Sequence, residues 1–115
     1  MNVINGKLQY RDKEYNLVFN LNVMEKVQDE YGSLDEWGAL TDGKKGEPNA
    51  KAVIFGFTEM INEGIDIQND ENGTQEPFLT KKQVGRIITE IGLVEATKTL
   101  NETVIESTKS EEKNA

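Results

Sequence analysis

The sequence predicts an α+β fold, mainly α, with an N-terminal β-hairpin packed on a small bundle of about four to five helices. Three observations predict this fold. β-branched and aromatic residues gather near the N-terminus, apolar residues then recur at helical spacing, and the helical segments start at capping residues and end at glycines. We expect one globular domain over residues 1–106, because a chain of 115 residues can bury about two-thirds of the surface that it exposes when unfolded.

The hairpin is expected at residues 3–19, with a polar turn at 11–13 between its strands. In the second strand, alternate residues are apolar and should be buried: Tyr15, Leu17 and Phe19. The intervening set, which includes Val18, should mostly face water. A hairpin of two strands is only marginally stable alone in water, so it should lie on the helices.

Helices are expected at about 21–31, 33–40, 49–64, 80–91 and 93–106. Asn20 or Asn22 can cap the first helix and Ser33 the second, since their side chains accept from amides of the first turn. The third helix is the most apolar and is therefore the expected central helix. It is predicted to end at Gly64, followed by an acidic loop over 65–76, and residues 41–48 are predicted to form an exposed loop.

The fourth helix has the clearest start, because Thr80 and Gln83 have the spacing of a capping box. Phe78 is the expected hydrophobic staple before that cap. The fourth helix should end at Gly92 and the fifth should begin directly after it, since glycine adopts the left-handed conformation without steric cost. Residues 107–115 are predicted to be a disordered acidic and polar tail.

The composition argues against several kinds of function. The chain has no Cys and no His, which removes zinc sites, thiol nucleophiles and Ser-His-Asp chemistry. Acidic residues number 21 and basic residues 13, so the net charge is −8, and we expect no nucleic-acid binding. No apolar run approaches the roughly 20 residues that span a bilayer, and no signal peptide begins the chain. We expect a soluble cytoplasmic protein without membrane association.

Three motifs suggest chemistry, and each has a simpler interpretation. The segment 38–45 nearly matches a phosphate-binding loop, but Lys45 replaces the hydroxyl that would ligate magnesium. The acidic residues of 65–76 lack the final bidentate carboxylate of a calcium loop. Glu59 and Glu63 could pair as acid and base, although a solvated helix face explains their spacing better. We therefore predict a protein that is not an enzyme and has no catalytic residue, metal or cofactor.

The last helix carries more apolar residues than one packing face needs. Val94 and Ile105 lie off its main apolar row. The excess indicates either a surface for a partner or for self-association, or simple burial beneath the hairpin. The candidate partner-binding residues are Leu93, Val94, Leu100, Val104 and Ile105.

The order of these elements also resembles a known family. A hairpin leads into a helix with the series 19–33, which ends Tyr-Gly-Ser, and a Gly-rich loop and an apolar helix follow. Leu-Thr-Lys-Lys-Gln-Val at 79–84 and Gly92-Leu93 precede the final helix. Across about residues 8–106 this arrangement resembles the tail assembly chaperones of long-tailed (siphovirus-like) bacteriophages and prophages.

The resemblance implies a protein of the host cytoplasm that is absent from the mature virion. Such a chaperone coats the tape measure protein and recruits tail tube subunits during tail assembly, and some relatives form homo-oligomeric rings or spirals. Two other hypotheses stay open. The chain could be a structural virion component, such as a connector or tube-associated subunit, or an acidic mimic that binds a host protein.

Overall fold

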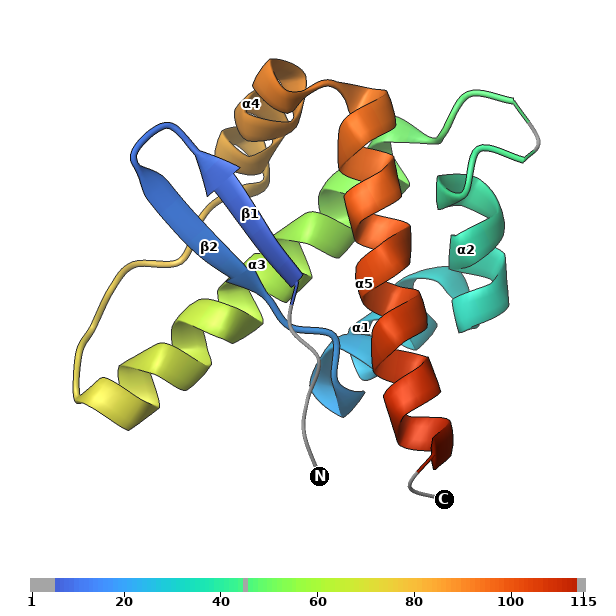
Figure 1. The fold of residues 1–115 in the computed structure, drawn as a ribbon. Coiled ribbons are helices and arrows are strands. Elements are labelled where there is room, and N and C mark those ends of the chain that lie inside the picture. Colours follow the sequence, from blue (N-terminus) through green and yellow to red (C-terminus); the bar gives the residue numbers. More distant parts are fainter. Residues whose placement is uncertain (1–5, 45, 114–115) are drawn as a thin grey trace.

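The computed structural model describes residues 6–44 and 46–113, with side chains described through Lys109. It confirms the predicted fold class, because an antiparallel hairpin of two strands precedes five helices in the described part of the chain (Figure 1). The strands are β1 (Gly6–Tyr10) and β2 (Lys13–Leu17). The helices are α1 (Leu21–Tyr31), α2 (Leu34–Thr41), α3 (Ala50–Asn72), α4 (Lys81–Ile91) and α5 (Leu93–Lys113).

The helix α3 crosses the middle of the molecule, and β2 and the other four helices all pack on it (Figure 1). Its residues are buried on more than one face between Ala52 and Gly64. A surface helix buries only one stripe, so this burial identifies α3 as the central helix, as the sequence predicts. Trp37 of α2 is almost fully buried, and its indole N–H donates to the carbonyl oxygen of Ala52 at 3.0 Å.

The hairpin has a tight turn at residues 11–12, because Tyr10 pairs with Lys13. Arg11 has φ 58°, in the left-handed region that such turns require. The prediction that Val18 mostly faces water is wrong. The strand ends at Leu17, so its alternation does not extend to Val18. The backbone N–H of Val18 donates to the carbonyl oxygen of Met60 at 3.3 Å, and the Val18 side chain is buried. Residues 3–5 of the predicted hairpin lie outside the described residues.

The prediction that the third helix ends at Gly64 is wrong, because α3 continues to Asn72. Gly64 has a different role, since a Cβ at this position would lie 2.6 Å from the carbonyl oxygen of Asn16 in β2. The glycine permits close packing of helix and hairpin. The helix ends at Gly73, which has φ 65° and ψ 30° and donates its N–H to the carbonyl oxygen of Asn69.

The segment between α3 and α4, which includes the end of the predicted acidic loop, is held against α3 by two asparagine side chains. Asn62 donates to the carbonyl oxygen of Leu79 at 3.0 Å and accepts from its N–H at 2.9 Å. Asn69 makes the same pair of bonds with Glu76, at 3.1 and 2.9 Å. The segment between α3 and α4 therefore runs back along α3 and determines where α4 begins (Figure 1).

The predicted capping box of α4 is confirmed, because Thr80 and Gln83 exchange hydrogen bonds between side chain and backbone. Gly92, with φ 101°, separates α4 from α5. The helix α5 is longer than predicted and runs to Lys113 instead of ending at residue 106. Residues 107–113 are therefore helical and not a disordered tail, and residues 114–115 lie outside the described part of the chain.

Two glycines in helix interiors provide a test of the contact between α3 and β2. We expect Gly64→Ala to destabilise the protein by about 1–3 kcal/mol, because the new methyl group collides with the backbone of Asn16. The control is Gly85→Ala in α4, where the new Cβ would lie 3.6 Å from Cδ1 of Ile54, an ordinary contact. This control should stabilise the protein by up to about 1 kcal/mol through helix propensity. Urea unfolding measures both, and equal effects would contradict the close packing at Gly64.

Candidate functional site

The five residues that the sequence indicates as a partner surface do not lie on one surface. Leu100 is fully buried and Val104 is 9% exposed, whereas Val94 is 81% and Ile105 is 57% exposed. Leu93 is partly buried and packs against the core. The prediction is therefore wrong for Leu100 and Val104, which belong to the core of the molecule.

The spacing along α5 explains this division. Ala96, Leu100 and Val104 follow one another at intervals of four residues, which places them on one face of the helix. That face lies on α3, since a Cβ built on Gly56 would lie 3.3 Å from Cδ1 of Leu100. Val94 and Ile105 lie off this row, so the packing that buries Leu100 leaves them in solvent.

The exposed face of α5 forms one wall of a groove of about 830 Å³, which we call the α5 groove. The other wall comes from Gly38 of α2 and from residues 42–44 and 46–48 of the loop between α2 and α3. The α5 residues that line the groove are Val94, Thr97, Lys98, Asn101, Glu102 and Ile105. Its rim mixes acidic and basic side chains, and its two exposed aliphatic side chains come from α5.

Hydrogen bonds fix the two walls relative to each other. The side chain of Asn101 donates to the carbonyl oxygen of Thr41 at 3.1 Å and to that of Thr97 at 2.9 Å, which ties α5 to the end of α2. The backbone N–H of Asn49 donates to the carbonyl oxygen of Leu40 at 2.8 Å and closes the base of the loop. The groove is thus largely preformed.

Asn101 and the loop belong to this site, although neither was among the predicted partner-binding residues. Asn101 stands seven residues after Val94 and four before Ile105, and this spacing alone would have placed it on the same helix face. The contribution of the loop depends on how α2 and α5 pack, which no local pattern shows.

Thr97 gives the groove wall an unusual feature. Its hydroxyl is buried and has no hydrogen-bond partner among the described residues. Nearby threonines donate to the carbonyl oxygen four residues earlier, as Thr99 does to Glu95 and Thr103 to Thr99. An unpaired buried hydroxyl costs about 1–3 kcal/mol, so this wall contains a donor whose pairing would stabilise it.

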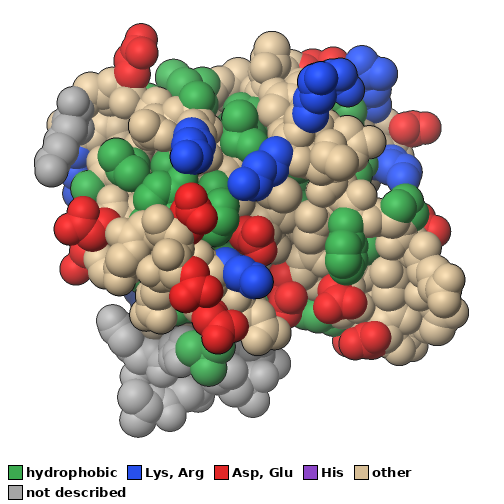
Figure 2. Space-filling view, turned by 180° about the vertical axis from the view of Figure 1, so that it is seen from behind, with side chains coloured by type: hydrophobic (Ala, Val, Ile, Leu, Met, Phe, Trp, Pro, Cys, Tyr) green, Lys and Arg blue, Asp and Glu red, His purple; other side chains and the backbone are tan. Residues whose placement is uncertain are grey.

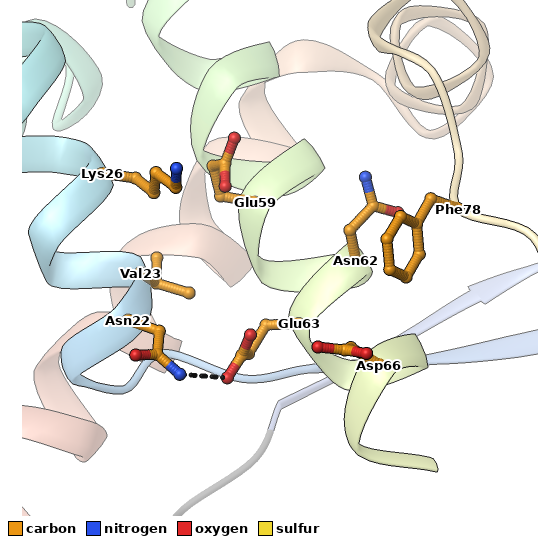
Figure 3. Close-up of a pocket in the computed structure, with 8 residues that line it drawn as sticks. All are labelled: Asn22, Val23, Lys26, Glu59, Asn62, Glu63, Asp66 and Phe78. Atoms are coloured by element: carbon orange, nitrogen blue, oxygen red, sulfur yellow. Dashed lines mark hydrogen bonds between the residues drawn. The ribbon is translucent and has the colours of Figure 1, made fainter. Parts of the chain in front are cut away.

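A second, smaller pocket of about 240 Å³ lies between α1, α3 and Phe78 (Figure 3). The carboxylate of Glu63 accepts hydrogen bonds from the side chains of Asn20, at 2.8 Å, and Asn22, at 3.1 Å. Glu63 therefore anchors the start of α1, and this structural role accounts for it better than paired acid-base chemistry with Glu59 does. Phe78, the predicted hydrophobic staple, is 55% exposed, whereas the next residue, Leu79, packs against the core.

Comparisons with protein-family models, with curated proteins and with solved structures find no match to this chain. The resemblance to tail assembly chaperones therefore rests on the sequence motifs. Among the described side chains, no three acidic ones are grouped to hold a metal ion. No helix within residues 6–44 and 46–113 is long and apolar enough to cross a membrane. The segment that nearly matches a phosphate-binding loop begins inside α2 at Gly38, and its Lys45 lies outside the described residues.

The division of α5 into a buried and an exposed face predicts a large effect of one truncation and almost none of another. Leu100→Ala should lower the free energy of unfolding by about 2–5 kcal/mol, because it leaves a cavity beside α3. Val94→Ala should change it by less than about 0.5 kcal/mol, because this side chain is already in water. Denaturant unfolding of both variants measures the difference. A large loss of stability from Val94→Ala would show that α5 is rotated differently.

Proposed function

We propose that this protein is a nonenzymatic tail assembly chaperone, which binds the tape measure protein through the α5 groove and recruits tail tube subunits during tail assembly. The observation that carries the proposal is the pair of exposed aliphatic side chains, Val94 and Ile105, on one wall of a preformed groove. The sequence resemblance supplies the identity of the partners. It also supplies the location, the host cytoplasm and not the mature virion.

The dimensions of the groove suit a helical partner. Val94 and Ile105 are about 17 Å apart along the axis of α5, at a rise of about 1.5 Å per residue. This distance is about three turns of a second helix lying beside α5, so apolar residues on one face of that helix can contact both side chains. A long apolar helix of a tape measure protein aggregates unless it is covered. The net charge of −8 keeps a covered complex dispersed.

The test is co-purification of the chain with tape measure and tail tube proteins. The double variant Val94→Glu/Ile105→Glu should weaken binding of the tape measure protein at least tenfold, because it removes two apolar contacts and adds charge to the groove. The matched control is Leu21→Glu/Phe78→Glu, which adds the same charge at exposed apolar residues outside the groove. The control should bind as the unchanged protein does, and both variants should keep its Tm.

Two outcomes would contradict the proposal. One is full binding by the groove variant, which would place the partner elsewhere. The other is the presence of this protein in purified particles, which would favour a structural virion component. Strongly salt-sensitive binding to a basic host protein, with no binding to either tail protein, would instead favour the acidic mimic.

A further inference from the structure

A second open groove of about 760 Å³ lies between the hairpin turn, the exposed face of α4 and Ile54 of α3. We call it the α4 groove. Its basic residues are Arg11, Lys81, Lys82 and Arg86, and the one carboxylate that lines it is Glu90. The local charge balance is therefore opposite to that of the whole chain, which is −8. Lys and Arg side chains gather near the top of the face shown in Figure 2, at the level of α4 in Figure 1.

Two of the four cationic groups make cation–π contacts with aromatic rings. The guanidinium of Arg11 lies 5.1 Å from the centroid of the Tyr10 ring, and it donates to Glu90 at 3.3 Å. The ammonium of Lys81 lies 5.6 Å from the centroid of the Phe55 ring. Lys82 and Arg86 make no hydrogen bond or ion pair with the described residues. These two side chains are exposed, and they are free to pair with carboxylates of another molecule.

The floor of the groove contains a glycine that the chain itself does not require. Gly85 lies within α4, and a Cβ there would make only an ordinary contact with Ile54. Alanine would fit this position and favours a helix more than glycine does. The missing side chain keeps the floor open beside Ile54 and Thr89, so the backbone of a bound segment can come close to α4.

We propose that the α4 groove binds an acidic amphipathic helix of a partner protein. Carboxylates at i and i+4 of that helix would pair with Lys82 and Arg86, which are themselves four residues apart, and its apolar side chains would cover Gly85 and Ile54. From Lys81 to Thr89 the groove follows α4 for about 12 Å, about two helical turns.

A nucleic acid suits this groove poorly. Duplex DNA carries one charge per about 1.7 Å, so its phosphates would extend beyond a short basic groove. Outside the groove, the remainder of the chain is strongly acidic. A short segment, with its negative charges confined to the groove, avoids this repulsion. The α4 groove shares no lining residue with the α5 groove, so this inference does not depend on the proposed function.

The test uses the full chain and two synthetic helical peptides. The probe peptide has a row of Leu flanked by Glu at i and i+4, and the control peptide has Gln in place of each Glu. Fluorescence anisotropy should show that the Glu peptide binds at least tenfold more tightly than the Gln peptide at low salt. The difference should shrink as salt screens the charges. Single-stranded DNA of similar length should bind more weakly than the Glu peptide.

Two triple variants, each of which removes three positive charges, test where on the protein the Glu peptide binds. Lys81→Gln/Lys82→Gln/Arg86→Gln should reduce binding of the Glu peptide at least tenfold. The matched control, Lys26→Gln/Lys51→Gln/Lys109→Gln, removes the same charge outside both grooves and should bind within twofold of the unchanged chain. Gly85→Leu fills the floor without changing the charge, and it should weaken binding several-fold without lowering Tm.

Three results would overturn the inference. The first is equal loss of binding in both charge variants, which would mean that only total charge matters. The second is unchanged binding of the Glu peptide by both of two separate variants, Gly85→Leu and the groove charge variant. The third is tighter binding of DNA than of the Glu peptide, which would identify the groove as a general site for polyanions.

Discussion

Close packing on α3 is the constraint on which the rest of the structure depends. Trp37 lies against α3 at Gly56, where its ring fills the space that a side chain would need, and its indole N–H bonds to the carbonyl oxygen of Ala52. Leu100 reaches the same place from α5, and Gly64 admits the backbone of β2 farther along the helix. The two glycines let a helix pair and a hairpin approach one central helix closely enough to share one core.

This packing also determines which surfaces remain for binding. Because Leu100 and Val104 point toward the core, the rotation of α5 is fixed and Val94 must face the loop between α2 and α3. On another part of the surface, the hairpin turn approaches α4 and brings Arg11 beside the lysines of that helix. The α5 groove presents aliphatic side chains and the α4 groove presents cations, so the two surfaces select partners of different chemistry.

Features that depend on local chemistry were predictable from the sequence. The capping box at Thr80 and the apolar pattern of the central helix identify helices wherever they pack. The role of Gly64 was not predictable, because the contact that requires glycine comes from Asn16, far away in the sequence. Helical spacing separated Val94 and Ile105 from the main row of α5, but the burial of Leu100 depends on where α2 and α3 lie. For the same reason, no local pattern indicated the loop wall of the groove.

Native-state amide hydrogen exchange tests the central role of α3 most directly. The account predicts that amides between Ala52 and Gly64 are among the slowest to exchange and open only with global unfolding. Amides of the last two turns of α3, where fewer side chains are buried, should exchange faster. If the central amides of α3 exchange faster than those of α5 or the hairpin, α3 is not the element on which the others depend, and the account is contradicted.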